Sequence, residues 1–212
     1  MKEINNVSMQ ELINISPCEY AEKLAREQFV DYKIKQMWTP MPRIAGPAFT
    51  VKCGQGDHLS LHVAIYQAQA GDILVVETDG EFATTGGNVC AIAQQRGIKG
   101  MVIDGLIRDL AEIRGLKFPL YARGVMPKPA KKEQMYPFNQ TIMCGGVTVN
   151  AGDIVVADED GIAIIPQADL IAVYQAAKIR TDADAAMNLA QWQAQHQKKI
   201  SSKLQELGYG GR

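Results

Sequence analysis

Apolar positions along the chain fall into short runs that alternate with helical segments. Residues 44–53 mix β-branched and aromatic residues with Gly46 and Pro47, which is typical of an edge or bulged strand. Two continuous apolar runs follow at residues 73–77 and 100–104, each preceded by a helical pattern and a glycine-containing turn. Apolar runs separated by helices predict parallel strands joined by crossovers, so we predict an α/β core.

Capping residues predict where the helices begin and end. Two capping boxes, Ser8 with Glu11 and Ser16 with Glu19, predict two short helices before residue 29. Further helices are predicted to begin at the caps Asp57, Asn88 and Asp109, and the last two to end at Gly97 and Gly115.

The pattern changes after residue 125. A loop rich in Pro and Lys covers residues 125–134, and the glycine pairs and acidic turns that follow are typical of antiparallel hairpins. Residues 167–207 contain no proline and are rich in Ala, Gln and Lys, which predicts one or two helices, the last of them polar. We therefore predict one domain over residues 1–212: an N-terminal helical region (1–43), a core (44–166) and a C-terminal helical extension (167–212).

Composition narrows the classes of partner. The 212 residues are 47% hydrophobic, which is ample for a buried core, and 22 basic residues nearly balance 23 acidic ones. With the charges balanced, the chain has no net field that would attract nucleic acid or an anionic membrane, so a small-molecule or protein partner is expected. Without a long apolar run or an N-terminal apolar h-region, a cytoplasmic protein is expected. The four cysteines form no Cys-x-x-Cys pair, which argues against a zinc knuckle or a dithiol redox motif.

A glycine pair lies just beyond one predicted strand. Gly86 and Gly87 allow close approach of a ligand to the backbone, and the free N–H groups near Asn88 and Val89 would bind an anion such as a carboxylate. A Gly-Gly pair is also typical of a plain turn, and this second interpretation stays open.

Acidic residues gather beyond the next predicted strand. Asp104, Asp109 and Glu112 lie within nine residues together with Arg108, and Asp109 and Glu112 would share a helix face. Hard oxygen ligands of this kind suit Mg²⁺ or Mn²⁺. A helix cap, a turn residue and a surface ion pair would account for the same residues equally well.

Four collinear segments carry a family resemblance: GQGDHLSLHVA (54–64), VIDGLIRD (102–109), FPLYARG (118–124) and GDIVVADEDG (152–161). Over residues 46–166 the chain resembles the RraA-like family, which includes 4-hydroxy-4-methyl-2-oxoglutarate aldolases and oxaloacetate decarboxylases. The family signature is a glycine, twenty residues, an arginine, an acidic residue, two residues and a further acidic residue. Gly87, Arg108, Asp109 and Glu112 meet it.

The resemblance implies a fold, a reaction and a set of site residues. The fold would be a compact β/β/α core like the swivelling domains of phosphotransfer enzymes, assembled as a homotrimer or hexamer. Asp109 would bind Mg²⁺ directly, and other acids, with Glu112 and Asp104 as the candidates, would hold its waters. Arg108 would contact the keto oxygen of a 2-oxo dicarboxylate, and amides near residues 88 and 89 would hold its 1-carboxylate. Metal and guanidinium would then stabilise a pyruvate enolate.

The chain departs from the dedicated aldolases of the family at one position. They carry an aspartate where this chain has Gly87, and Glu112 is the residue that could replace it. No side chain is an obvious base for the aldol hydroxyl proton, so a metal-activated water is expected. A Schiff-base mechanism would need a desolvated lysine, whereas the lysines near the predicted strand ends are expected to be solvated.

Two further interpretations complete the prediction. His58 and His62 lie four residues apart on a predicted helix, a spacing that can bind zinc, but packing or hydrogen-bonding histidines are favoured because no acid lies between them. The family's namesake inhibits an endoribonuclease by direct contact, so a non-catalytic, protein-binding regulator of a ribonuclease is the alternative function. Direct binding of nucleic acid is not expected, because aromatic and basic residues do not interleave. Membrane binding is not expected either, because the charges balance and no long apolar run is present.

Overall fold

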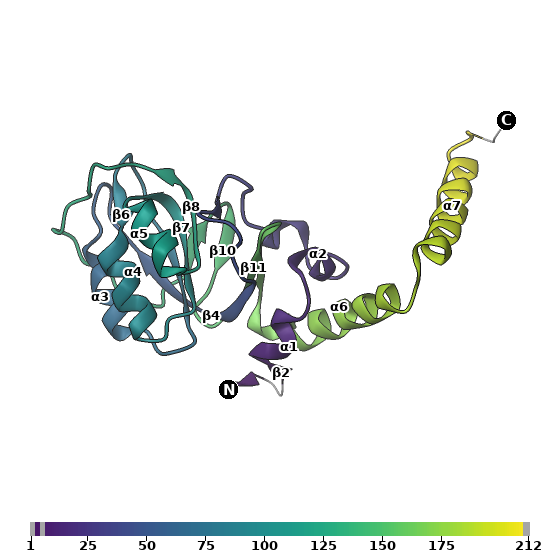
Figure 1. Cartoon of the computed structure of the whole chain (residues 1–212), viewed down its shortest axis with the longest axis horizontal. Coiled ribbons are helices and arrows are strands. Elements are labelled where there is room, and N and C mark those ends of the chain that lie inside the picture. The colour runs from purple at the N-terminus through teal and green to yellow at the C-terminus, as the bar shows by residue number, and fades with distance from the viewer. Residues whose placement is uncertain (1–2, 5–6, 210–212) are drawn as a thin grey trace.

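A mixed sheet of eight strands forms the centre of the computed structural model, which describes residues 3–4 and 7–209 (Figure 1). Its parallel strands are β4 (Ile44–Lys52), β5 (Ile73–Glu77), β7 (Gly100–Ile107) and β8 (Leu120–Val125). The helices between them are α3 (Leu59–Gln67), α4 (Gly87–Gln95) and α5 (Leu110–Leu116), which lie together on one side of the sheet. The predicted α/β core with parallel crossovers is therefore confirmed.

Antiparallel strands flank the parallel ones. The sheet runs in the order β12-β11-β4-β5-β7-β8-β3, and the short strand β6 (Ala83–Thr85) pairs parallel with β7. The antiparallel strands are β11 (Ile154–Asp158), β12 (Gly161–Ile165) and β3 (Lys35–Gln36). A separate hairpin of β9 (Ile142–Cys144) and β10 (Val147–Val149) packs on β4 and β5. Antiparallel pairing after residue 125 is thus as predicted.

The N-terminal region contains the two short helices that its capping boxes predict, together with short strands that the sequence did not predict. It consists of β1 (Glu3–Ile4), β2 (Val7–Ser8), α1 (Met9–Ile13), α2 (Pro17–Tyr20) and the 3₁₀ turn η1 (Arg26–Gln28). At the start of α1 the Glu11 carboxylate accepts the Ser8 backbone N–H at 2.9 Å, and the Ser8 hydroxyl accepts the Glu11 N–H at 3.2 Å. The reciprocal bonds satisfy two backbone donors that a helix start otherwise leaves free.

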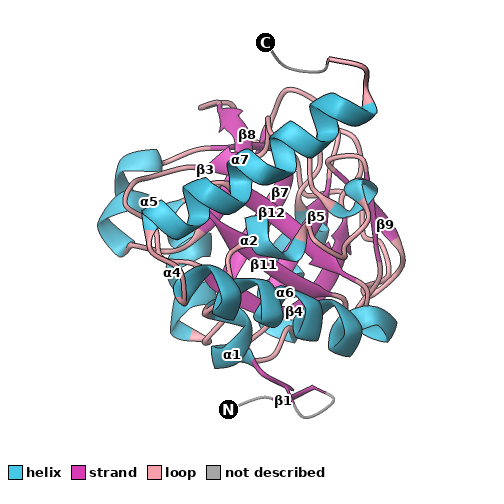
Figure 2. Cartoon of the chain, turned by 90° about the vertical axis from the view of Figure 1, so that its right-hand side faces the viewer, coloured by secondary structure: helices cyan, strands magenta, loops and turns pink. Residues whose placement is uncertain are grey.

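The C-terminal extension contains two helices after the 3₁₀ turn η2 (Gln167–Asp169). The first, α6 (Leu170–Ala185), packs on α2, whereas α7 (Leu189–Glu206) has no buried residue. In Figure 1, α7 projects away from the rest of the chain, and Figure 2 shows α6 and α7 in front of the sheet. In the described part of the chain, no helix is both long and apolar enough to cross a membrane.

The core has two parts, one on each side of β4 and β11. The larger part joins the sheet to α3, α4, α5 and the β9–β10 hairpin, and it fully buries the apolar residues of β5 and β7 apart from Leu106. The smaller part joins β11 and β12 to α1, α2 and α6 through residues such as Leu12, Tyr20 and Leu170. Central strands covered on both faces need continuous apolar sequence, which explains the unbroken runs in β5 and β7.

Candidate active site

Arg108 and Asp109 follow β7 directly, at the carboxyl end of the parallel strands. Asp109 precedes α5 in a left-handed conformation, with φ 58° and ψ 40°, which costs a non-glycine residue roughly 1–3 kcal/mol. A side chain normally caps its own helix from an extended backbone conformation. Asp109 is not extended, and its carboxylate makes no capping bond to α5, so the prediction that Asp109 caps this helix is wrong. Its Oδ2 instead accepts the Gly87 N–H at 3.1 Å and lies 3.5 Å from the Arg108 Nε. The end of α5 also differs: the chain turns at Lys117, with φ 55°, and not at Gly115.

The N-terminus of α4 faces this carboxylate. Gly86 is the N-cap of α4 and Asn88 lies inside the first turn, so the prediction that Asn88 caps the helix is wrong. A Cβ at Gly86 would overlap the Asp109 carboxylate and lie 3.1 Å from the Arg108 Cγ, so only glycine allows this approach. The backbone N–H groups of Asn88 and Val89 lie in the first turn, where no preceding turn supplies carbonyl partners. They are therefore suited to an anion.

Glu112 lies against the next glycine. A Cβ at Gly87 would overlap the Glu112 carboxylate, so that carboxylate fills the space a side chain at position 87 would need. Asp109 and Glu112 thus approach the same turn of α4 from one end of α5. Mg²⁺ keeps several waters and usually takes one or two protein carboxylates, so this pair fits such an ion. Among the described residues, no group of three or more His, Cys, Asp or Glu side chains is placed to hold a metal ion.

Asp104 lies apart from the other two acids. Its Oδ1 accepts the Arg123 Nε–H and its Oδ2 accepts the Gly145 N–H at 2.6 Å, at the turn of the β9–β10 hairpin. Arg123 also donates to Asp31 at 2.9 Å. On β5, Glu77 lies beside Asp104 and accepts the Met143 N–H of the same hairpin. The structure therefore uses Asp104 to hold this hairpin on the sheet, and does not bring it together with Asp109 and Glu112.

Two histidines line the same pocket as Arg108 and Asp109. The pocket is bounded by residues of α3, β6, α4 and the end of β7, namely His58, His62, Ala83, Thr85, Gly86, Asn88, Val89, Arg108 and Asp109. The rings of His58 and His62 are 4.2 Å apart, and the Nδ1 atom of His58 is buried without a hydrogen-bond partner among the described residues. The favoured prediction of simple packing histidines did not anticipate this position. The sequence feature that could have predicted it is the four-residue spacing of the two histidines on a helix that begins just after the carboxyl end of β4.

The charge state of the two histidines follows from burial and neighbouring cations. Burial, followed by the neighbouring His58, Lys132 and Arg108, lowers the pKa of His62 to about 4. Burial, followed by Lys132, also lowers the pKa of His58, while the carbonyls of Ala83 and Thr84 oppose the change. Both rings are consequently neutral near pH 7, and each has a nitrogen able to accept a proton.

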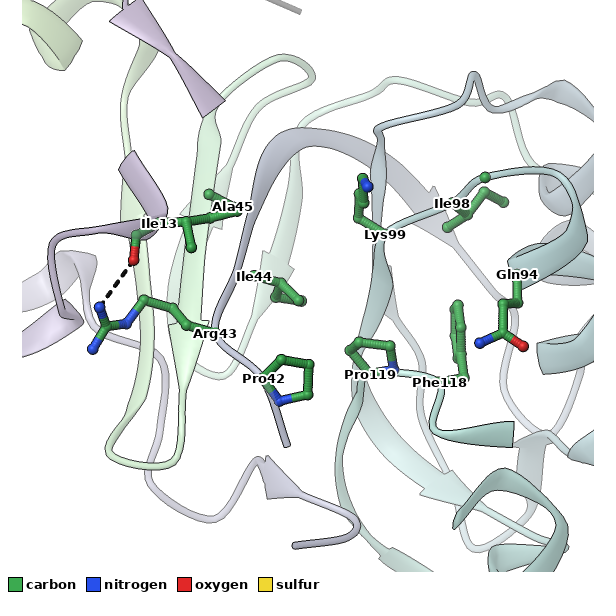
Figure 3. A pocket seen from close by; sticks show the side chains of 11 residues that line it. Ile13, Pro42, Arg43, Ile44, Ala45, Gln94, Ile98, Lys99, Phe118 and Pro119 are labelled. Carbon is green, nitrogen blue, oxygen red and sulfur yellow. Dashed lines mark hydrogen bonds between the residues drawn. The ribbon is translucent and has the colours of Figure 1, made fainter. Parts of the chain in front are cut away.

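A larger cavity, of about 350 Å³ against about 50 Å³ for the pocket above, opens at the other end of the strands. Figure 3 shows Pro42 and Ile44 on one side of it and Lys99 and Pro119 on the other. Its guanidinium, from Arg43, is already bonded to Asp158 at 2.8 Å and to the Ile13 carbonyl at 2.9 Å. Open α/β sheets bind ligands at the carboxyl ends of strands, so the smaller pocket is the candidate active site.

The chain is an α/β protein with carboxylates and a helix N-terminus at the carboxyl ends of its parallel strands, which is where open α/β sheets bind ligands. The family model for RraA-like proteins, described as Aldolase/RraA, matches residues 17–164, which is more than half of the chain. The chain therefore belongs to the RraA-like family.

Individual relatives agree with this assignment. A protein of Halalkalibacterium halodurans, provisionally named a 4-hydroxy-4-methyl-2-oxoglutarate aldolase, is 37% identical over 150 residues, covering 70% of this chain and 71% of the relative. The RNA-processing inhibitor RraA from Thermus thermophilis has a similar structure, with a TM-score of 0.60 and 28% identity over 65% of this chain and 84% of that one. An uncharacterised protein from Pseudomonas syringae, 21% identical, shares the fold with a TM-score of 0.75 over 92% of this chain and 98% of its own. The predicted RraA-like fold with its terminal helices is thus confirmed.

Proposed function

We propose that this protein is a divalent-metal-dependent carbon–carbon lyase that cleaves a 2-oxo dicarboxylate and releases pyruvate through its enolate. The observation that carries the proposal is the convergence of Arg108, Asp109 and the N-terminus of α4 on one pocket. The name of the H. halodurans relative supports retro-aldol cleavage of 4-hydroxy-4-methyl-2-oxoglutarate. Oxaloacetate decarboxylation would use the same groups, because it leaves the same enolate.

Each group would act on one part of the substrate. The N–H groups of Asn88 and Val89 would bind the 1-carboxylate, favoured by the positive end of the α4 dipole. Arg108 would donate to the keto oxygen, where negative charge develops as the carbon–carbon bond breaks. Asp109, with Glu112 beside it, would hold Mg²⁺ or Mn²⁺, which when bound supplies further positive charge for that oxygen.

A Schiff-base mechanism has less support. No lysine lines the described pocket. Lys52 is bonded to Glu77 at 2.8 Å, and that carboxylate raises the pKa of Lys52, so its amine stays protonated. A lysine nucleophile needs the opposite shift, because only the neutral amine attacks a carbonyl.

The departure from the dedicated aldolases is compatible with the proposal. They carry an aspartate at the position of Gly87, and in this chain the Glu112 carboxylate occupies the space beside that glycine. A carboxylate thus remains at the place where the dedicated aldolases carry one, although it comes from α5 and not from α4.

Metal-dependent pyruvate release tests the proposal. Pyruvate would be measured from 4-hydroxy-4-methyl-2-oxoglutarate and from oxaloacetate, with Mg²⁺ or with EDTA. Asp109→Asn keeps a residue that tolerates left-handed backbone but removes the charge, and Arg108→Gln removes the guanidinium. We expect EDTA to abolish turnover and each substitution to lower kcat by about 100-fold or more. Glu206→Gln, on the exposed helix α7, is the matched control for a lost carboxylate and should leave kcat unchanged.

The alternative function would give the opposite result. If the wild type releases no pyruvate from either substrate with Mg²⁺, the lyase proposal is wrong. The RraA name of the Thermus structure would then direct the next assay to inhibition of an RNA-processing endoribonuclease by the purified chain.

A further inference from the structure

We infer that His62 is the general base that removes the hydroxyl proton of the substrate in the carbon–carbon cleavage. The inference rests on the proposed lyase function and supplies the base for which the sequence offers no obvious candidate. Its first support is position: His62 projects from α3 into the pocket that also contains Arg108 and Asp109.

The ring of His62 is partly exposed and lies next to the ring of His58. His58 is 6% exposed, and the two ring centroids are 4.2 Å apart with planes tilted by 42°. His62 itself is only partly buried, and no side-chain hydrogen bond of its ring is found among the described residues. A neutral, accessible imidazole beside a guanidinium is suited to accept a proton from a group bound at that guanidinium.

A bound substrate would improve His62 as a base. In the free protein, Lys132 and Arg108 disfavour its protonation, while Asp57 near His58 and the Asp109 carboxylate are the acidic groups of this region. The divalent metal of the proposed site would also disfavour protonation, whereas a dicarboxylate substrate adds two negative charges to the metal-loaded pocket, and nearby anions favour the protonated form of an imidazole. Proton transfer is most efficient when the pKa of the base lies near the working pH, so substrate binding shifts His62 in the productive direction.

The step balances without any additional reactant. His62 accepts the proton of the 4-hydroxyl group, the freed electron pair forms the new carbonyl, and the bond between C3 and C4 breaks. The electron pair of that bond becomes the enolate of the first pyruvate, while the second pyruvate leaves as a keto acid. His62 then returns its proton to C3 of the enolate, which gives the first pyruvate.

Oxaloacetate offers a control substrate within the same site. Its decarboxylation breaks a bond to a carboxylate and releases CO₂, with no hydroxyl proton to remove. The same enolate forms and takes its C3 proton from solvent, so this reaction does not need a base for a hydroxyl. A residue that only shapes the pocket would affect both reactions, whereas a base for the hydroxyl would affect the aldol cleavage selectively.

The experiment compares wild type, His62→Gln and His196→Gln on both substrates with Mg²⁺. His196 is the third histidine of the chain and stacks on Trp192 in α7, so its substitution is a matched control. For His62→Gln we expect kcat of the retro-aldol cleavage to fall by about 100-fold or more, with KM nearly unchanged. The kcat for oxaloacetate and the affinity for oxalate, a mimic of the pyruvate enolate, should stay within a few-fold of wild type.

Other outcomes overturn the inference in distinguishable ways. Equal losses on both substrates, or no loss on either, would show that His62 is not the hydroxyl base while leaving the lyase function standing. A wild type inactive on both substrates would remove the proposed function and the inference with it. If His62→Gln does not fold, His62→Asn serves as the second variant, because its shorter amide avoids crowding in the pocket.

Discussion

Gly87→Ala should destabilise the protein although it adds one methyl group at the start of a helix. The new Cβ would overlap the Glu112 carboxylate and lie 2.9 Å from the Glu112 Cβ. Turning the Glu112 side chain away cannot move its Cβ, so α4 and α5 must separate. Overpacking of this kind costs about 1–3 kcal/mol. Replacing glycine in a helix recovers roughly 0.5–1 kcal/mol, which leaves a net loss of up to about 2.5 kcal/mol.

Urea denaturation followed by circular dichroism would measure this loss against a matched control. Gly115→Ala makes the same substitution in α5, where the new Cβ meets nothing within 4 Å, and it should stabilise by up to about 1 kcal/mol. Glu112→Ala removes the carboxylate from the contact, so Gly87→Ala should cost about 1 kcal/mol less in that background. The reasoning is refuted if Gly87→Ala is as stable as Gly115→Ala, or if its cost does not depend on Glu112.

Three further predictions concern buried polar groups and thiols. Asp57→Asn should cost about 2–3 kcal/mol in urea denaturation, because the carboxylate accepts three backbone N–H groups. Burial raises the pKa of Asp57 but these bonds lower it below its ordinary value, so the wild type should lose this stability as pH falls below about 4, and Asp57→Asn should not. Asp104→Asn should loosen the β9–β10 hairpin, seen as faster amide exchange, without weakening Mg²⁺ binding; a weakened Mg²⁺ affinity would restore Asp104 as a ligand. Cys18 alone should react with a thiol reagent in the native protein, since the other cysteines are buried, and labelling of more than one thiol before unfolding would contradict this.

Local pattern predicts much of the fold, because the strands and helices carry their own signals. The apolar runs of β5 and β7 identify strands covered on both faces, and the capping boxes identify α1 and α2. The order of strands in the sheet has no such signal. Placing β11 beside β4 depends on pairing Ile154 with Pro47 across most of the core, and only the packed structure determines such contacts between distant segments.

The residues of the candidate site likewise include some that the sequence could predict and some that it could not. The spacing from Gly87 to Arg108 is the length of one helix and the strand that follows it, α4 and β7. Because the helix runs back along the sheet and the strand returns, both residues end at the same edge, and the signature therefore reports a real contact. His58 and His62 reach that edge from a different crossover, so no short motif links them to Arg108. Asp104 lies within the signature region but on β7 itself, where its side chain meets the β9–β10 hairpin. Asp104 was predicted as a site residue because it is close to Arg108 in the sequence. The two histidines were not, because they are far from Arg108 in the sequence.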